Sequence, residues 1–510
     1  MSSDPKASSD KAAREGARGA AFITLAKMWF MATGFLQPLV LTRLLGTDGY
    51  GLYALALSAV SIVNNVVVTG SIQSMSRAVI QGGSQALRRG LLLHAALGVL
   101  LGGSLALGAG VLGAGVLHDS RLPGLLRIGA IVVADYSVYA ALVGAFNGRH
   151  RFATQAALDI TFSTMRTALV LGLASTSMRV TGAVAGFAVA SFVIVGVAFF
   201  AARRDVFGGD EREETNRSPF AEFARAYGGF FAPVLVYQLA LNLVLQVDGL
   251  LFKAIASRGG MAEAEVNSLV GIYKAVQNFA FLPYQLLLAV TFVVFPVVSR
   301  STLEGDRETT RSFVDGAIRF SAMALGAMLS VLAGLPRGVL GLAYKPEYHD
   351  GDHALRILSL GQGAFALSVI GTTIILAAGR TRAATAIMVV TLIGVVAGDV
   401  AGVQLSHGGI SALQGIASGT AAGWGLGVLL VGWYVRAEFG AFLRLPTAGR
   451  VALCTAVAAV VAGKLPLHGK VGTLLAAGVT VGLYVVLLAV TGELGRAEIE
   501  RVKRLTRRGK

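Results

Sequence analysis

The chain is a succession of long apolar segments separated by short polar ones. Each segment can cross the roughly 30 Å hydrocarbon core of a bilayer as a helix of about 20 residues. Because the segments are continuously apolar instead of alternating, they favour helices over a transmembrane β-barrel. We therefore expect an all-α integral membrane protein with about 14 transmembrane helices, at residues 20–41, 49–69, 91–116, 124–146, 155–176, 180–202, 229–252, 267–297, 313–335, 355–378, 383–404, 410–435, 448–464 and 471–492.

The composition excludes a soluble globular protein. Hydrophobic residues make up 55% of the 510 residues and charged residues only 14%, whereas soluble domains carry about 25% charged residues. The net charge of +16 is scattered over many short polar segments, without the aromatic-rich basic fold that nucleic-acid binding requires. The single Cys454 allows no intramolecular disulfide and no cysteine metal cluster, so neither a metal nor a cofactor is expected.

The basic residues orient the chain in the membrane. If the N-terminus is cytoplasmic, the polar segments inside carry 29 of the 44 Lys and Arg residues, those outside carry 10, and five lie within spans. This asymmetry follows the positive-inside rule. It predicts an even number of spans and two cytoplasmic termini.

Two pairs of short motifs indicate an internal duplication. GRHRFAT at 148–154 matches GRTRAAT at 379–385, and GLYALALSAVSIVNN at 51–65 is similar to GIYKAVQNFAFLPYQ at 271–285. The first six predicted helices therefore repeat as the next six. Because six is even, both copies share one orientation, as in the parallel repeats of transporters.

The duplication predicts how the chain is divided. No polar segment is long enough to form a soluble domain, so the divisions fall between groups of helices. The expected parts are a disordered cytosolic tail at 1–19, an N-lobe of six helices at 20–202, a cytosolic linker at 203–226, a C-lobe of six helices at 227–437, two further helices at 438–492 and a basic cytosolic tail at 493–510.

Polar residues fall on single faces of three predicted helices. Their spacing of three or four residues places them on one side of each helix. Such faces on duplicated helices favour a hydrated cleft between the two halves, although ordinary helix packing is the alternative. The residues are Gln238, Asn242, Gln246 and Lys253 near 229–252, Lys274, Asn278 and Gln285 within 267–297, and Ser58, Ser61 and Asn65 within 49–69.

Lys274 stands in an otherwise uncharged apolar run. A Lys at the centre of a membrane helix costs about 2.5 to 3.5 kcal/mol, so it needs a partner, water or substrate. An anionic substrate that passes through the cleft would supply that compensation. The alternative is that the side chain reaches the membrane boundary along its apolar stem.

The other charges within spans have competing explanations. Lys27 and Arg166 could face the cleft, or Arg166 could form a structural pair with Asp135 in a neighbouring helix. Asp248 could bind a coupling cation or offset the charge of Lys253. Two simpler roles are a local pair of Arg319 with Asp315 and an anchoring role at the outer membrane boundary for Arg127 and Arg356.

Five motifs, in their order along the chain, resemble a known family. They are LTRLLGTDGYGLYALALS at 41–58, LVLQVDGLLFKAIAS at 243–257, VGIYKAVQNFAFLP at 270–283, FPVVSR at 295–300 and YKPEYHDGDHALRILS at 344–359. Over about residues 20–435 the chain resembles the polysaccharide transporters, the lipid-linked oligosaccharide (O-antigen type) flippases of the multidrug/oligosaccharidyl-lipid/polysaccharide exporter superfamily. The resemblance implies a MATE-like arrangement, with two six-helix lobes around a central cavity.

The resemblance also implies a function. It implies a flippase of the bacterial cytoplasmic membrane that moves a polyprenyl-pyrophosphate-linked oligosaccharide by alternating access, for cell-surface lipopolysaccharide or exopolysaccharide synthesis. Proton or sodium coupling is compatible with it, as are a polysaccharide polymerase and chain-length machinery as partners. The candidate cavity residues are Lys274, Lys27, Arg166, Gln238, Asn242, Gln246, Asn278, Gln285 and Asn65, with Asp248 for the coupling ion.

Two other functions stay open. An ion-coupled multidrug or cation exporter of the same superfamily would share the fold. A membrane glycan polymerase or glycosyltransferase would need an acidic or Arg-bearing site, and one outer loop offers acids and histidines but also suits a plain hydrated surface. Its residues are Glu347, His349, Asp350, Asp352 and His353.

Overall fold

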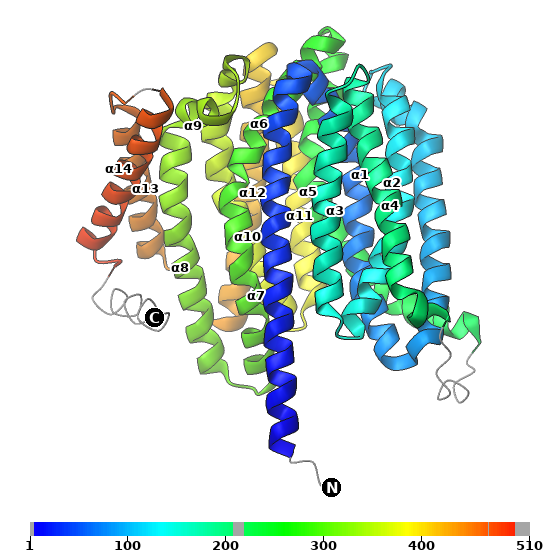
Figure 1. The fold of residues 1–510 in the computed structure, drawn as a ribbon. Coiled ribbons are helices and arrows are strands. Elements are labelled where there is room, and N and C mark those ends of the chain that lie inside the picture. The colour runs from blue at the N-terminus through cyan, green and yellow to red at the C-terminus, as the bar shows by residue number, and fades with distance from the viewer. Residues whose placement is uncertain (1–4, 208–218, 468, 495–510) are drawn as a thin grey trace. The chain divides into compact units, whose positions relative to one another are not determined.

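A computed structural model describes residues 5–207, 219–467 and 469–494 (Figure 1). Over these residues the chain is helical, without strands. Residues 208–218 of the expected linker and residues 495–510 of the expected basic tail lie outside the described residues. The described parts pack as two units, Met1–Gly271 and Ile272–Lys510.

The first unit consists of long helices and the start of α6. α1 packs against α2, α3, α4 and α5, and α2 and α3 both pack against α4. The helices are α1 (Pro5–Gly110), the π-helical η1 (Val111–Val116), α2 (Leu122–Gly148), α3 (Phe152–Ala174), α4 (Arg179–Phe207), α5 (Phe220–Arg258) and α6 (Glu263–Ala280).

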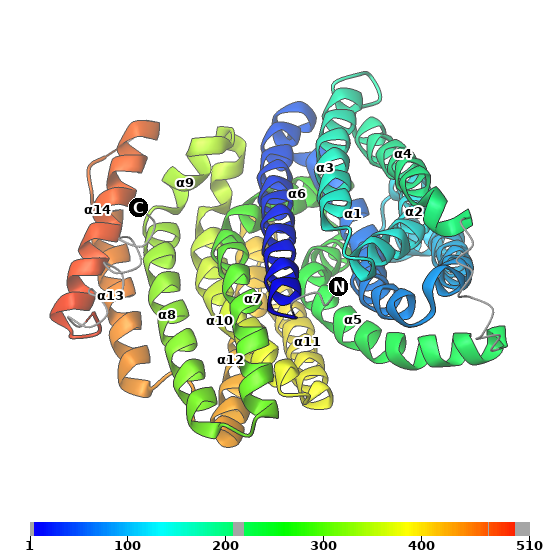
Figure 2. The same ribbon diagram turned by 60° about the horizontal axis from the view of Figure 1, so that its bottom comes forward.

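The second unit contains the rest of α6 and all later helices. α10 packs against α7, α8 and α12, while α13 lies between α8 and α14 (Figure 2). The helices are α7 (Leu282–Leu303), α8 (Arg307–Gly334), α9 (Pro336–Ala343), the 3-10 helix η3 (Pro346–Gly351), α10 (Asp352–Ala377), α11 (Thr381–Gln404), α12 (Gly409–Phe439), α13 (Leu445–Gly463) and α14 (Gly469–Val490).

Two glycine breaks divide α1 into three rods. Gly46 has φ 72° and Gly83 has φ 55°, and the backbone at both leaves the helical region. Glycine adopts positive φ at no steric cost because it has no Cβ. Residues on either side of each break therefore stay helical while the chain changes direction.

The breaks also affect the number of candidate spans. The described residues contain eleven helices long and apolar enough to cross a membrane, or twelve if a bent pair within Glu263–Leu303 counts as one span. The first, Phe22–Val116, holds the three rods of α1, and each rod exceeds the about 20 residues that a span needs. Counted as separate spans, the rods raise the total to 13, or to the expected 14 if the bent pair is also counted.

The N-terminal tail differs from the expectation. α1 begins at Pro5, so residues 5–19 are helical and the expected disorder is wrong there. The stretch is rich in Ala, Lys and Arg, which are strong helix formers. High polarity alone suggested disorder, whereas the intrinsic propensity of these residues favours extending the first helix.

Glycines let α11 and α12 touch through their backbones. A Cβ on Gly402 would overlap the carbonyl oxygen of Gly415, and a Cβ on Gly415 would overlap that of Gly402. Small residues allow such close approach where no hydrophobic effect drives membrane helices together. The α11–α12 pair therefore depends on these positions.

Replacing Gly402 with Ala should lower the thermal unfolding temperature of the detergent-purified protein. The methyl group must push α11 away from α12, and such overpacking costs about 1 to 3 kcal/mol. The matched control is Gly425→Ala in α12, where a Cβ meets no atom within 4 Å. An equal or higher unfolding temperature for Gly402→Ala would contradict the close packing.

Candidate functional site

A buried ion pair joins a loop of the first unit to α5. Asp119 lies in the loop before α2, and its Oδ2 is 3.4 Å from the Nζ of Lys253 in α5. The same oxygen accepts a hydrogen bond of 2.6 Å from the Nδ2 of Asn267 in α6. All three residues are fully buried. A charge at such a depth is tolerated because the partner and the hydrogen bonds compensate it.

Arg121 extends this contact to α1. Its guanidinium donates hydrogen bonds of 3.0 and 2.9 Å to the two oxygens of Asp48, just after the Gly46 break. It also lies 3.5 Å from the carboxylate of Glu263 at the start of α6. We call the whole group the Asp119 cluster, which consists of Asp48, Asp119, Arg121, Lys253, Glu263 and Asn267.

The cluster keeps Asp119 ionised. Burial alone would raise the pKa of the Asp119 carboxyl, but hydrogen bonds from the Asn267 amide and the Arg121 backbone N–H, together with the Lys253 ammonium, hold it below its ordinary value. The carboxylate is therefore charged at neutral pH. The electrostatic contribution of the pair to stability is lost only in acid, as the pH falls through that lowered pKa.

Next to the cluster, α1 and α6 meet backbone to backbone. A Cβ on Gly51 would overlap the carbonyl oxygen of Asn267, and a Cβ on Gly271 would overlap that of Thr47. The hydroxyls of Thr47 and Ser268 are 3.2 Å apart. This joint links the predicted N-lobe to the first two helices of the predicted C-lobe.

The polar stripe of α5 partly faces α1. The hydroxyl of Ser58 donates a 3.0 Å hydrogen bond to Oε1 of Gln246, so two of the predicted polar faces contact each other directly at this pair. Asn242 is buried and donates to the backbone oxygen of Gln238 one turn earlier. Asn65 is exposed.

Lys274 lies in α6 with a side chain that is only 8% exposed. One turn later, Nδ2 of Asn278 donates a 3.1 Å hydrogen bond to the hydroxyl of Tyr344. Gln285 lies on α7, because α6 ends at Ala280 and a new helix begins at Leu282. The predicted single polar face is therefore divided between two helices.

The predicted cations of the N-lobe have partners that the sequence did not reveal. Nζ of Lys27 is 4.0 Å from Oδ2 of Asp159, and Oδ1 of Asp159 accepts a hydrogen bond from Tyr139. The guanidinium of Arg166 lies over three aromatic rings, at 4.9 Å from Phe30, 5.9 Å from Phe162 and 5.6 Å from Phe187. Aromatic faces stabilise a cation in this way.

The suggested pair of Arg166 with Asp135 is wrong. Asp135 instead accepts a 2.7 Å hydrogen bond from the hydroxyl of Ser191 in α4. Sequence spacing placed both charges at similar depth, but it does not show which side of each helix faces the other. Arg166 therefore obtains its compensation from rings and not from a carboxylate.

The suggested local pair of Arg319 with Asp315 is also wrong. Arg319 is 3.2 Å from Glu493, and Asp315 is 3.0 Å from Arg444. Arg450 of α13 also contacts Glu493, at 3.1 Å. These long-range pairs fasten α13 and the end of α14 to α8.

Asp248 is fully buried, and its Oδ1 accepts a 2.7 Å hydrogen bond from the backbone of Gly249. Lys253, which Asp248 was suggested to offset, has its ion-pair partner in Asp119. In the second unit, Asp399 of α11 accepts a 2.7 Å hydrogen bond from Thr420 of α12, whose hydroxyl is 3.3 Å from that of Tyr273. Sequence reasoning missed this series of polar contacts, although a lone Asp in an apolar segment was a signal for it.

His94 was missed as well. Its Nε2 is 2.7 Å from the hydroxyl of Tyr227, and its Nδ1 is 3.3 Å from that of Ser71 and 3.5 Å from that of Ser137. Both serine hydroxyls donate to backbone oxygens, so Nδ1 carries the proton and Tyr227 donates to Nε2. The ring thereby joins α1, α2 and α5.

The acidic loop at 344–353 is arranged around two tyrosines. Tyr344 and Tyr348 are buried with ring centroids 5.3 Å apart, and Glu347, Asp350 and His353 are exposed. Among the residues that the structure describes, no group of three or more His, Cys, Asp or Glu is placed to hold a metal ion.

Replacing Asp119 with Ala should lower the stability of the purified protein strongly, by about 3 to 5 kcal/mol, because Lys253 would stay buried without its partner. Removing both charges as Asp119→Leu with Lys253→Met should restore most of that loss. Thermal unfolding in detergent measures both. Arg300→Ala, which breaks an exposed pair with Glu304, is the control with an effect of about 0 to 1 kcal/mol. Additive effects of the two single substitutions would refute the coupling.

Comparisons with solved structures place the fold. The chain is similar to a structure described as "Lipid II flippase MurJ, inward closed conformation", with a TM-score of 0.71, 15% identity and coverage of 92% of this chain and 98% of that one. A multidrug resistance MATE family transporter in an inward-facing conformation gives a TM-score of 0.65 at 16% identity, covering 80% of this chain and 94% of that one. The chain therefore has a MurJ- and MATE-like fold.

Comparisons of sequence identify the family. An uncharacterized membrane protein, YabM of Bacillus subtilis (strain 168), is 25% identical over 278 residues, which is 52% of this chain and 51% of that protein. The chain thus matches about half the length of this curated relative. The model of the family described as "Polysaccharide biosynthesis protein" matches residues 17–302. This multi-pass membrane protein belongs to the polysaccharide biosynthesis protein family.

Proposed function

We propose that this protein is a flippase that carries a glycan linked to a polyprenyl diphosphate across the bacterial cytoplasmic membrane. The family, the many apolar spans and the MurJ- and MATE-like fold support a transporter in place of an enzyme. The structural observation that carries the proposal is the joint between α1 and α6 at the Asp119 cluster. It lies where helices of the two predicted lobes meet.

The contacts in this joint are of a kind that can separate and form again. Its contacts are ion pairs, hydroxyl contacts and backbone packing at Gly51 and Gly271. Water can replace polar partners of this kind when the helices separate, whereas separating interlocked apolar side chains would expose them to water at about 25 cal/mol per Å². In the proposed cycle the joint is closed while the opposite side of the transporter admits substrate.

Cations in the helices supply the proposed path for the diphosphate. Lys274 is the principal candidate, because a buried ammonium can make charge-assisted hydrogen bonds to phosphate oxygens. Lys27 and Arg166 would assist, with sugar hydroxyls meeting the polar side chains. These are Gln238, Asn242, Gln246, Asn278, Gln285 and Asn65.

Asp248 is the proposed site for a coupling proton or sodium ion. Both termini would lie in the cytoplasm, as the charge asymmetry predicts. A polysaccharide polymerase and chain-length machinery would receive the glycan on the far side. A drug exporter is the rival, since a MATE transporter shares the fold; membership of the polysaccharide biosynthesis family favours a glycan.

The decisive experiment measures on which side of the membrane the lipid-linked glycan accumulates. Cells that lack this protein should accumulate the glycan on the cytoplasmic leaflet, where an impermeant glycosidase added to spheroplasts does not reach it. Reintroducing the gene should restore cleavage. If the glycan is equally accessible in both strains, this protein is not the flippase.

Lys274 is expected to act through its charge. Lys274→Ala should lower glycan export by roughly ten- to a hundredfold, since a hydrogen bond to a charged group contributes about 1.5 to 3 kcal/mol. Lys274→Arg should retain much of the export, and Lys274→Glu should be worse than Ala. Export and membrane abundance are measured together, with the exposed Arg382→Ala as control. Normal export by the Ala and Glu variants at normal abundance would remove Lys274 from the path.

We expect the joint between α1 and α6 to open in each transport cycle. Thr47→Cys with Ser268→Cys, in a Cys454→Ser background, places two thiols where two hydroxyls are 3.2 Å apart. A disulfide requires such close approach of the two side chains. Oxidation should stop export and reduction should restore it. Each single-Cys variant should be insensitive to oxidant. Full export by the crosslinked protein would show that α1 and α6 do not separate.

A further inference from the structure

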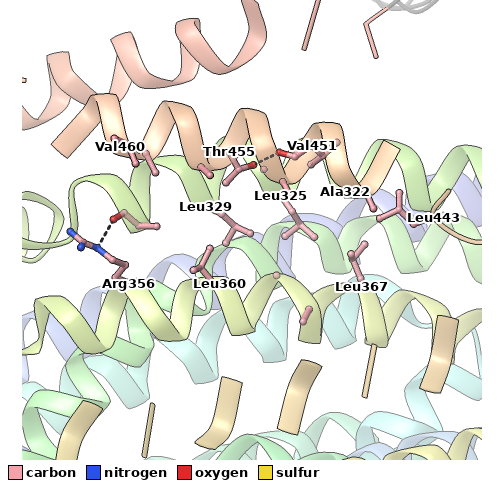
Figure 3. A pocket seen from close by; sticks show the side chains of 18 of the residues that line it. Ala322, Leu325, Leu329, Arg356, Leu360, Leu367, Leu443, Val451, Thr455 and Val460 are labelled. Atoms are coloured by element: carbon pink, nitrogen blue, oxygen red, sulfur yellow. Dashed lines mark hydrogen bonds between the residues drawn. The ribbon is translucent and has the colours of Figure 1, made fainter. Parts of the chain in front are cut away.

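An apolar groove runs between α8, α10 and α13 in the second unit. It encloses about 620 Å³. Figure 3 shows aliphatic side chains from all three helices pointing into it. The larger ones are Leu325, Leu329, Leu360, Leu367, Val451 and Val460.

The groove is open along one side. Leu360 is 52% exposed and Val460 is 59% exposed. Both lie within predicted spans, so the open side faces the hydrocarbon of the bilayer and not water. An apolar chain from the bilayer can therefore enter sideways.

Two cations stand at one end of the groove. Nε of Arg356 donates a 2.9 Å hydrogen bond to the carbonyl oxygen of Ala333 at the end of α8 (Figure 3). A Cβ on Gly463 would lie 3.3 Å from the carbonyl oxygen of the next residue, Gly334. Lys464 follows directly and lines the groove too. Arg356 and Lys464 thus share the end that is formed by the C-terminal ends of α8 and α13.

Neither cation is neutralised by the protein. Within the described ranges, no carboxylate lies within 4 Å of Arg356 or Lys464, whereas Arg319, Arg444 and Arg450 of the same unit all have carboxylate partners. The carbonyl of Ala333 accepts from Nε of Arg356 and thereby orients the guanidinium. Its two terminal nitrogens are left to bind an anion.

The length of the groove matches one leaflet. From Arg356 to Leu367, α10 advances by eleven residues, which is roughly 16 Å at 1.5 Å per residue. Half of the hydrocarbon core is about 15 Å. A ligand with its charge at Arg356 therefore places its apolar chain along the groove and ends near the middle of the bilayer.

We propose that this groove binds one anionic phospholipid of the bilayer, with the phosphate at Arg356 and Lys464 and an acyl chain against α8, α10 and α13. The two uncompensated cations favour a lipid of net negative charge over a zwitterionic lipid, whose own ammonium competes for the phosphate. The lipid occupies the groove between α13, α8 and α10, and it therefore adds contacts that hold the two C-terminal helices against α8. This inference does not rest on the proposed transport activity.

Native mass spectrometry of the detergent-purified full chain tests the site. The protein is titrated with palmitoyl-oleoyl phosphatidylglycerol or with phosphatidylcholine of the same chains. We expect one phosphatidylglycerol to be retained at least tenfold more tightly than phosphatidylcholine, because charge-assisted contacts to phosphate are the stronger hydrogen bonds. Equal retention of the two lipids would overturn the proposal.

Variants separate the headgroup contact from the acyl contact. Lys464→Gln and Arg356→Gln should each lose most of the preference, Arg356→Lys should keep much of it, and Ala456→Phe should reduce binding of both lipids by filling the groove. Arg337→Gln, an exposed cation of α9 outside the groove, is the matched control and should bind as the unmodified chain does. Gel filtration and thermal unfolding verify that each variant is folded.

Two further outcomes would also overturn the proposal. If folded Ala456→Phe retains phosphatidylglycerol normally, the lipid binds elsewhere on the surface. If a polyprenyl diphosphate displaces phosphatidylglycerol one for one, and the same variants abolish its binding, the groove belongs to the transported carrier and not to a bilayer lipid.

Discussion

Within the hydrocarbon of a bilayer no water is available to a backbone N–H or C=O, so each span must satisfy its own hydrogen bonds. This constraint makes the spans of the described residues helical. It also explains how helices pack here. With no hydrophobic effect to join them, α11 and α12 approach through Gly402 and Gly415 until their backbones touch. Polar side chains are then the costly exceptions, and each requires a specific partner.

The chain compensates its buried and half-buried charges in three ways. Lys253 pairs with the carboxylate of Asp119, which also accepts a hydrogen bond from the Asn267 amide, as a buried ion pair requires. Arg166 lies among aromatic rings. Arg319 reaches across to Glu493, 174 residues away, and donates to its backbone oxygen as well. In each case the compensation also joins helices that are distant in the sequence, so the charges determine which helices lie together.

The sequence predicted the class of fold because hydrophobicity and length are local properties. The long apolar helices of the described residues and the glycine-rich contacts between them agree with patterns that a few residues reveal. The partners of the charged residues could not be predicted in this way, because they are distant in the sequence. Asp119 and Asn267 are 148 residues apart, and depth in the membrane does not show which way a side chain points. The pairs suggested for Arg166 and Arg319 failed for that reason.

Contact with a carboxylate separates the structural cations from those that can hold a ligand. Lys253 and Arg319 contact carboxylates, so an incoming anion would have to displace a partner and leave a buried carboxylate unpaired. Arg356 is oriented by a carbonyl oxygen, which fixes the guanidinium without neutralising it. Because an arginine stays charged in any protein environment, such a residue at the mouth of an apolar groove retains its attraction for a phosphate. The arrangement of acids, more than that of bases, therefore indicates where this protein can bind anionic lipids.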